Sequence, residues 1–190
     1  KARKEGYPAR SVYKLKEMDE KFSLISSAKT TDTRVLDLGA APGSWSLYVL
    51  RKLKGKGFLA AVDLSPLSRQ HDKGLFEADN FIFFQGDIYD ASVRDRLLSK
   101  GPYNLVISDA APATSGNRSV DTLRSLDLSE EVLNYAEMAL SSGGAFVVKV
   151  FQGGDTSTLL KRMKGLFNKA RSFKPEACRK ESFETYYIGM

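Results

Sequence analysis

Short, nearly continuous apolar runs recur along the chain at intervals that suit alternating strands and helices. Five of them are RVLDLG (34–39), GFLAAVDLS (57–65), NFIFFQGD (80–87), YNLVISDAAP (103–112) and GAFVVKVF (144–151). A strand covered on one face alternates apolar and polar residues, whereas these runs are apolar at most positions, as in strands covered on both faces. We therefore predict five parallel strands at the centre of the fold.

The segments between these runs have the periodicity of amphipathic helices. They are SWSLYVLRKL (44–53), ASVRDRLLSK (91–100) and SLDLSEEVLNYAEMALSSGG (125–144), the last of which ends on glycines that suit a helix C-terminus. After the fifth run, a helix is predicted over 156–167, with an apolar stripe of Leu159, Leu160, Met163, Leu166 and Phe167. Two strand-like pieces follow, ARSFKP (170–175) and SFETYYIGM (182–190). Alternating strands and helices predict an α/β fold with a parallel sheet and helices on both of its faces.

Length and composition indicate a single domain. A chain of 190 residues is long enough for one well-buried core, and 42% hydrophobic with 27% charged residues is typical of a globular protein. We predict one domain over residues 1–190: a basic helical segment over 1–30 and a core over 31–190. The first helix has an apolar stripe of Val12, Leu15, Met18 and Phe22. No apolar run approaches the ~20 residues of a membrane span.

Cysteine and histidine are too scarce for a disulfide or a structural zinc site. Cys178 is the single cysteine and His71 the single histidine. We therefore expect a metal-free mechanism and a reducing compartment, which is the cytoplasm, or the mitochondrion or nucleus if the source is eukaryotic. A monomer is expected.

Positive charge is concentrated near the two ends of the chain. Residues 1–16 contain six Lys or Arg and one Glu, and residues 161–181 contain eight Lys or Arg and two Glu. Because the whole chain has a net charge of +6, the rest of it must be acidic. If the fold brings the ends together, they form a surface that binds a polyanion. The alternative is a solvated surface without a partner.

The loop after the first strand has the features of a ligand-binding turn. In DLGAAPGSW, Gly39 and Gly43 allow a tight turn and a close approach of the backbone to a ligand, and Asp37 adds a polar contact. A dinucleotide site would favour G-x-G-x-x-G, but Ala41 and Pro42 interrupt that pattern. No G-x-x-x-x-G-K-[ST] occurs, so a nucleoside triphosphate is not indicated either.

Acids end the next three strands, where ligands of such sheets bind. A carboxylate at Asp63 could accept hydrogen bonds from both ribose hydroxyls, and one at Asp87 from an adenine amino group. Asp109, in SDAAP, follows the fourth strand. Each of them could instead form a turn or cap a helix, but three at successive strand ends favour an adenosine without phosphates. S-adenosylmethionine fits this description.

The combination of DLGAAPGSW, QGD, SDAAP, VVKVFQG and ARSVYKL resembles the FtsJ/RrmJ family of ribose 2′-O-methyltransferases over nearly the whole chain. The resemblance implies a Rossmann-like class I methyltransferase fold, with a seven-stranded, mostly parallel sheet and an antiparallel C-terminal strand. It implies a catalytic tetrad of Lys14, Asp109, Lys149 and Glu184, although KESFETYY also offers Glu181 at the last position. It implies S-adenosylmethionine-binding positions at Gly43, Trp45, Asp63, Asp87 and Asp109, to which the loop itself adds Asp37 and Gly39. Trp45 could also serve core packing. Ser44 departs from the glycine that the family commonly has there.

The chemistry of the two lysines is compatible with this resemblance. Lys149 lies in a strand otherwise made of Phe and Val, where a lysine without a function is costly, unless its side chain reaches solvent at the strand end. Lys14 lies beside the apolar stripe of the first helix. Acids near Lys149 would favour its charged form whereas burial and Lys14 would oppose it, so two roles stay open: a general base, or a group that orients the hydroxyl.

The charge pattern and the resemblance together predict an RNA substrate. The resemblance implies a uridine of large-subunit ribosomal RNA, free or in a pre-ribosomal particle, with transfer RNA or a cap as the alternatives within the family. We expect the phosphate backbone to contact Arg3, Lys4 and Arg10 at one end and Lys161, Arg162 and Lys164 at the other. A small-molecule methyltransferase and a non-catalytic RNA-binding module are alternatives of other classes.

Overall fold

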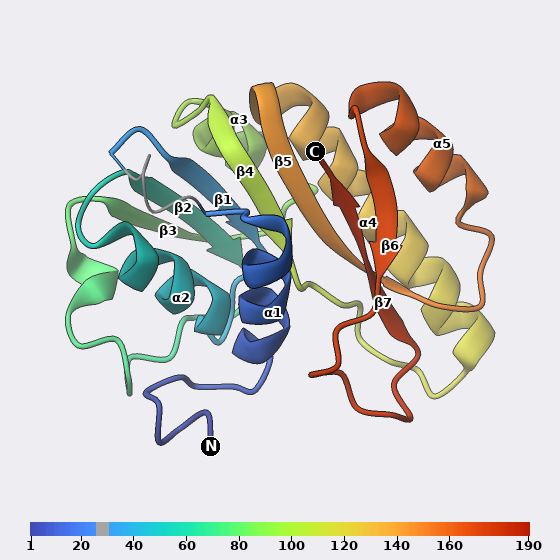
Figure 1. Cartoon of the computed structure of the whole chain (residues 1–190), viewed down its shortest axis with the longest axis horizontal. Helices are drawn as coiled ribbons and strands as arrows, with labels where there is room; N and C mark the ends of the chain where they lie inside the picture. The colour runs from blue at the N-terminus through green and yellow to red at the C-terminus, as the bar shows by residue number, and fades with distance from the viewer. Residues whose placement is uncertain (26–30) are drawn as a thin grey trace.

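A computed structural model describes residues 1–25 and 31–190. Its centre is one seven-stranded sheet in the order β3-β2-β1-β4-β5-β7-β6 (Figure 1). The strands are β1 (Arg34–Leu38), β2 (Phe58–Asp63), β3 (Phe81–Gln85), β4 (Tyr103–Ser108), β5 (Leu140–Phe151), β6 (Ala170–Phe173) and β7 (Glu184–Gly189). Neighbouring strands from β3 to β5 pair in parallel, and β7 pairs antiparallel with both β5 and β6. The predicted mostly parallel sheet with an antiparallel C-terminal strand is confirmed.

Helices cover both faces of the sheet, as predicted. They are α1 (Val12–Phe22), α2 (Ser44–Leu53), α3 (Ala91–Leu98), α4 (Arg118–Ala139) and α5 (Ser157–Leu166), with a 3-10 turn η2 (Leu75–Glu77). One apolar core joins α1 and α2 to the sheet, and a second core on the other face joins α3, α4 and α5 to it. Successive residues of a strand point to opposite faces, so Val35 enters the first core and Leu36 the second.

The N-terminal helix is held by the apolar stripe that its sequence predicts. Val12, Leu15 and Met18 are buried in the α1–α2 core, and Phe22 packs against its edge. The boundary predicted at residue 30, between the basic segment and the core, lies outside the described residues. Of the predicted α5 stripe, Leu159 and Met163 are buried, whereas Leu166 is exposed.

The prediction for the end of α4 is wrong. The helix starts earlier than expected because the Asn117 side chain caps it, accepting hydrogen bonds from the amides of Ser119 and Val120. It ends at Ala139, and the predicted C-terminal glycines belong to β5. A Cβ on Gly144 would lie 2.9 Å from the Leu140 side chain. The glycines therefore serve an irregular stretch of β5, where its pairing with β4 shifts register.

The strand order reverses between β1 and β4, which creates the point where such sheets bind ligands. The loops after these two strands come close together. Gly39 has a φ of +78°, and a Cβ there would lie 2.4 Å from the Cβ of Ala110. A side chain at residue 39 would thus push apart the two loops that border the site.

We expect Gly39→Ala to destabilise the fold by about 3 kcal/mol, from left-handed backbone strain plus the clash. Gly55→Ala is the matched control, because Gly55 has a φ of +77° but nothing lies within 4 Å of its added Cβ. The control should lose only about 1 kcal/mol of unfolding free energy. Urea denaturation of both variants measures the difference, and equal losses would show that the close approach to Ala110 has no cost.

Candidate active site

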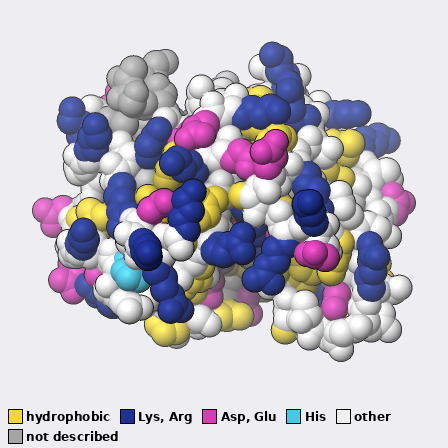
Figure 2. Space-filling view, turned by 60° about the horizontal axis from the view of Figure 1, so that its bottom comes forward, with side chains coloured by type: hydrophobic (Ala, Val, Ile, Leu, Met, Phe, Trp, Pro, Cys, Tyr) yellow, Lys and Arg dark blue, Asp and Glu magenta, His cyan; other side chains and the backbone are white. Residues whose placement is uncertain are grey.

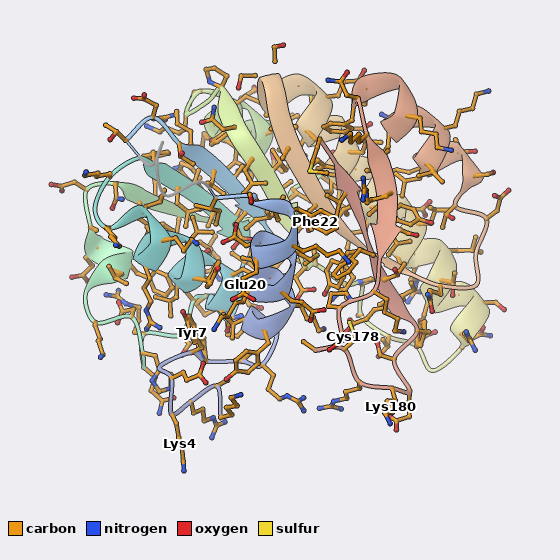
Figure 3. All side chains as sticks on the ribbon, viewed as in Figure 1. Lys4, Tyr7, Glu20, Phe22, Cys178 and Lys180 are labelled. Atoms are coloured by element: carbon orange, nitrogen blue, oxygen red, sulfur yellow. The ribbon has the colours of Figure 1, made fainter. Side chains whose placement is uncertain are left out.

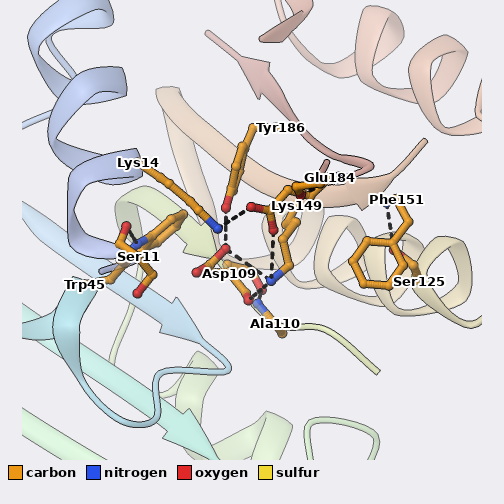
Figure 4. Close-up of polar contacts among 12 residues, drawn as sticks. Ser11, Lys14, Trp45, Asp109, Ala110, Ser125, Lys149, Phe151, Glu184 and Tyr186 are labelled. Atoms are coloured by element: carbon orange, nitrogen blue, oxygen red, sulfur yellow. Dashed lines mark hydrogen bonds and ion pairs between the residues drawn. The ribbon is translucent and has the colours of Figure 1, made fainter. Parts of the chain in front are cut away.

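Four charged side chains from four different elements meet at the carboxyl end of the sheet (Figure 4). Lys14 comes from α1, Asp109 follows β4, Lys149 comes from β5 and Glu184 begins β7. Strand pairing explains the meeting, because β7 starts opposite the end of β5, with Glu184 facing Phe151 in the register. These are the four residues that the resemblance assigns to the tetrad, and we use that name for them below.

Lys149 is surrounded by oxygen atoms. Its Nζ donates to the Asp109 carbonyl oxygen at 2.7 Å, lies 3.3 Å from Asp109 Oδ1, and lies 4.0 Å from Glu184 Oε2. Only 10% of its side chain is exposed, so it does not reach solvent at the strand end. An ammonium group has three donors and no acceptor, which suits these oxygens. The contact with Glu184 is too long for a hydrogen bond, so one donor direction is left for another oxygen.

Glu184 joins the two lysines of the tetrad. Its Oε1 forms an ion pair with Lys14 Nζ, and its other oxygen faces Lys149. Burial tends to raise the pKa of Glu184, but the hydrogen bond and charge of Lys14 and the charge of Lys149 outweigh burial and lower that pKa. The carboxylate is thereby kept ionised. The alternative residue, Glu181, is exposed and pairs with neither lysine in the described part of the chain.

Tyr186 is a fifth member of this cluster that the sequence analysis missed. Its hydroxyl donates to Asp109 Oδ1 at 2.5 Å, and its ring lies 5.9 Å from that of Trp45. Burial and the nearby charge of Asp109 raise the pKa of Tyr186 well above its ordinary value, so the phenol remains a donor. It lies opposite Lys149 in the β5–β7 register, a pairing that only the structure shows.

A cavity of about 250 Å³ lies beside the tetrad at the strand ends. Asp63, Asp87 and Asp109 all line it, together with Gly39. Asp63 accepts hydrogen bonds from the amides of Ala41 and Ser65, and Asp87 accepts one from the amide of Tyr89. The turn-forming role is therefore real for Asp63 and Asp87, and it also fixes the orientation of both carboxylates at the cavity wall.

The loop after β1 does not offer a phosphate cradle. The amides of Gly39 and Ala40 both donate to the Val62 carbonyl oxygen, and the amide of Ala41 donates to Asp63. Amides already bonded within the protein cannot bind a pyrophosphate as well. A cavity lined by carboxylates, beside a loop whose amides are engaged, fits an uncharged nucleoside such as the adenosine part of S-adenosylmethionine.

A second, smaller cavity of about 30 Å³ adjoins the first, since both are lined by Gly39, Ala41 and Asp109. Asp37 and Trp45 also line the smaller cavity. The Trp45 indole donates to the Ser11 carbonyl oxygen at 2.9 Å, so this buried ring both packs in the core and borders the site. Gly43, with a φ of +111°, precedes α2 and packs against Phe76, at the loop rather than in the cavity.

Asp37 is buried under the site. It accepts a hydrogen bond from Ser46 Oγ at 2.7 Å. Burial raises the pKa of Asp37 from an ordinary value of 3.8 to about 7; the Ser46 bond opposes this change, and the charges of Asp109 and Asp63 reinforce it. An acidic side chain here can therefore change its charge near neutral pH.

The third cavity, of about 500 Å³, opens on the other side of the tetrad. Ser11 lines both this cavity and the 30 Å³ one, so the three cavities follow one another across the tetrad. Lys14 and Glu184 line the third cavity, and Arg10 and Arg179 stand at its wall. Arg179 was not singled out from the sequence, because the basic residues of 161–181 were considered together as one charged segment, whereas α5 ends at Leu166 and Arg179 lies in the loop before β7.

Basic residues gather at the edge of the molecule where the third cavity opens. Figure 2 shows many Lys and Arg side chains on this face, and Figure 3 shows Lys4 and Lys180 projecting from the same edge. Arg3, Lys4 and Arg10 are exposed here.

The three basic residues of α5 lie elsewhere. Lys161, Arg162 and Lys164 belong to a helix that packs on the opposite face of the sheet from α1. Arg162 donates to Asn134 Oδ1 and to Glu137 Oε2, both on α4. The structure does not bring these residues to the tetrad, and the part of the 161–181 segment that reaches it is the loop that carries Arg179.

Neither a membrane span nor a metal cluster is evident in residues 1–25 and 31–190. No helix there combines the length and the apolar composition that crossing a bilayer requires. No group of three or more His, Cys, Asp and Glu side chains there is arranged to hold a metal ion.

Comparison with known proteins places this chain among methyltransferases. Residues 7–190 match the profile of the FtsJ-like methyltransferase family. The chain is 53% identical over 190 residues to the ribosomal RNA large subunit methyltransferase E of Treponema denticola, covering 100% of this chain and 91% of that protein. It is 47% identical over 189 residues to the protein of the same name from Borreliella afzelii, with 100% and 94% covered.

A solved structure of a methyltransferase also resembles this chain. The crystal structure described as a ribosomal RNA methyltransferase from Plasmodium falciparum superposes with a TM-score of 0.75 at 26% identity, over 96% of this chain and 97% of that chain.

The pKa of Asp37 predicts a specific pH dependence of stability. Between pH of about 4 and about 7 the folded protein binds a proton at Asp37 that the unfolded chain releases, so this group stabilises the fold at low pH and the contribution is lost as pH rises. Asp37→Asn should remove that pH-dependent share, which is on the order of a few kcal/mol. Unfolding free energies in urea at pH 5 and pH 8 measure it. The same change with pH in the wild-type protein and the variant would contradict the assignment.

Proposed function

This chain belongs to the FtsJ-like methyltransferase family, and from that premise we propose that it methylates a ribose 2′-hydroxyl of large-subunit ribosomal RNA, using S-adenosylmethionine. The observation that carries the proposal is the position of Asp109. It lines the cavity that fits an adenosine, and it also holds Lys149 in the tetrad. A cofactor bound in this cavity and a ribose hydroxyl bound at the tetrad would therefore both lie next to Asp109.

The residues around the two smaller cavities fit the parts of S-adenosylmethionine. Asp63 suits the ribose hydroxyls and Asp87 the adenine amino group, because each carboxylate is already oriented by amide hydrogen bonds. Asp37 and Trp45 border the smaller cavity, where an amino-acid part would lie. When bound, the cofactor supplies an electrophilic methyl group on a sulfonium.

Lys149 would position the attacking hydroxyl. A ribose hydroxyl is a weak nucleophile, so holding its oxygen in line with the methyl group is the main contribution that the protein can make. Lys149 is fixed by the Asp109 carbonyl and carboxylate, and its remaining donor direction can be directed at that oxygen. This geometry favours the orienting role over that of a general base, the two roles that the sequence left open.

Lys14 and Glu184 would complete the part of the site that receives the ribose of the RNA. Their ion pair forms part of the wall of the 500 Å³ cavity, and with Lys149 and Asp109 it makes the tetrad neutral as a whole. Tyr186 holds the Asp109 carboxylate from the core side. The hydroxyl proton would leave toward the carboxylate oxygens of Asp109 and Glu184 or toward the 500 Å³ cavity.

The 500 Å³ cavity and the burial of Lys149 also argue against the alternative functions. A small-molecule methyltransferase has no need of a 500 Å³ cavity with Arg10 and Arg179 at its wall. A non-catalytic RNA-binding module has no need of a nearly buried lysine between two carboxylates. Transfer RNA and a cap remain alternatives within the family, and the names of the two bacterial relatives favour ribosomal RNA. We place the activity where ribosomal RNA is found, in the cytoplasm.

Lys149→Ala and Asp63→Ala should give opposite kinetic patterns. Without Lys149 the hydroxyl is not held, so turnover should fall by at least about a hundredfold while cofactor affinity stays within a few fold. Without Asp63 cofactor affinity should fall first, by about tenfold or more. Tritiated methyl transfer to ribosomal RNA and calorimetric titration with S-adenosylmethionine measure the two effects. Near-normal methylation by Lys149→Ala would refute its role, and NAD binding in place of S-adenosylmethionine would refute the cofactor.

Two triple variants with the same change of charge test the RNA surface. Replacing Arg3, Lys4 and Arg10 by Gln should weaken RNA binding and flatten its salt dependence, by a slope of about 0.7–0.9 for each phosphate that the variant no longer neutralises. Replacing Lys161, Arg162 and Lys164 by Gln tests the other predicted group, and the position of α5 predicts the smaller effect. Cofactor affinity should be unchanged in both. If both variants bind RNA with wild-type affinity and slope, the basic residues are only a solvated surface.

A further inference from the structure

The loop between β6 and β7 is built to hold one conformation. The amide of Cys178 donates to the Pro175 carbonyl at 3.1 Å, and the amide of Ser182 to the Arg179 carbonyl at 3.0 Å, so two consecutive turns form it. Lys174 closes its base with a hydrogen bond to the Ser182 carbonyl oxygen. Pro175 and Cys178 are buried while Arg179 is exposed, so the loop is anchored from below and presents an arginine.

Glu17 attaches this loop to α1. Its Oε1 accepts from the amide of Glu176 at 2.8 Å and its Oε2 from the amide of Ala177 at 3.1 Å. Carboxylate bonds to two successive amides are charge-assisted and directional. Glu17 lies three residues after Lys14, on the same face of the helix, so one face of α1 holds both the start of β7, through Glu184, and the loop before it.

The loop so held puts Arg179 at the wall of the 500 Å³ cavity together with Arg10, which precedes α1. The cavity also contains the Lys14–Glu184 pair, whose charges are mutually compensated. Within residues 1–25 and 31–190, neither arginine forms an ion pair. Two guanidinium groups without a carboxylate partner, beside the tetrad, are suited to an anion that carries the target hydroxyl.

We propose that Glu17 is a positioning residue, which docks the β6–β7 loop on α1 so that Arg179 and Arg10 together bind a backbone phosphate of the RNA next to the target ribose. This inference rests on the proposed function, which supplies an RNA in the cavity, and it identifies which charges hold that RNA at the tetrad. A ribose and its neighbouring phosphate are joined in the chain, so a phosphate fixed at the cavity wall limits where the 2′-hydroxyl can lie.

Glu181 provides a second test, because its replacement should change RNA affinity in the opposite direction from that of Arg179. It lines the same cavity, and an exposed carboxylate there repels a phosphate. Arg179→Ala should weaken RNA binding about tenfold at low salt and reduce the salt slope by about 0.7. Glu181→Gln should strengthen binding about twofold. Fluorescence anisotropy with a labelled single-stranded RNA of about twelve nucleotides measures both.

Glu17→Gln tests the positioning role, with Glu20→Gln as the matched control. Both remove one carboxylate from α1, but Glu20 is exposed and, within residues 1–25 and 31–190, accepts no hydrogen bond from the β6–β7 loop. Glu17→Gln should weaken RNA affinity about threefold to tenfold and raise the KM for RNA, with kcat within about twofold. Glu20→Gln should change neither.

The combined variant Glu17→Gln/Arg179→Ala should bind RNA no more weakly than Arg179→Ala alone, because Glu17 acts through Arg179. Additive effects of the two changes, or wild-type affinity and salt slope in Arg179→Ala, would overturn the proposal. If Glu17→Gln fails to fold, Arg179→Ala and Glu181→Gln still decide it, since both side chains are exposed.

Failure of this inference is distinguishable from failure of the proposed function. Methyl transfer to ribosomal RNA with no effect of Arg179→Ala would refute only the phosphate site. The absence of methyl transfer, with RNA affinity that still depends on Arg179, would refute only the reaction.

Discussion

Lys149 is a cation in an apolar strand, and its need for oxygen partners determines the arrangement around it. A buried charge is stable only when it is paired and hydrogen-bonded. The partners come from the end of β4 and the start of β7, through Asp109 and Glu184. Two carboxylates beside one cation would leave an uncompensated negative charge, and Lys14 supplies the second cation. The tetrad is therefore neutral as a whole, and each of its members requires the others.

The sheet brings this cluster to the position where a ligand can use it. Because the strand order reverses between β1 and β4, the loops after those strands border a cavity, and Asp109 belongs to both the cavity and the tetrad. Gly39 permits the close contact with Ala110 that keeps the two loops together. On the side of the tetrad that faces the 500 Å³ cavity, α1 is in contact with β7 through Lys14 and with the loop before β7 through Glu17. The N-terminal helix is therefore part of the site.

Most of the fold could be predicted from the sequence, because its strands are continuous apolar runs and its helices have regular stripes. The α4–β5 boundary could not, since glycines that suit a helix end also suit a strand that approaches its neighbour closely, and only the pairing with β4 decides between them. The strand-end acids and Lys149 could be singled out because their residue types are unusual in their positions. Tyr186 could not, because a tyrosine in an apolar strand gives no sign of the carboxylate that it contacts.

The basic segment after β5 shows a second limit of sequence patterns. Eight Lys and Arg between residues 161 and 181 look like one surface, but α5 and the β6–β7 loop lie in different places, and only the loop reaches the third cavity. Charge along a sequence does not specify the face of the fold on which it lies.

The most direct test is to identify the methylated nucleoside in large ribosomal subunits from a bacterial strain that lacks its own homologous methyltransferase. The subunits would be incubated with this protein and labelled S-adenosylmethionine, and the RNA would be digested to nucleosides and analysed by mass spectrometry. The account predicts one labelled nucleoside, from large-subunit ribosomal RNA, with the methyl group on the ribose 2′-oxygen. A methyl group on a base, or label that enters only transfer RNA, would contradict it.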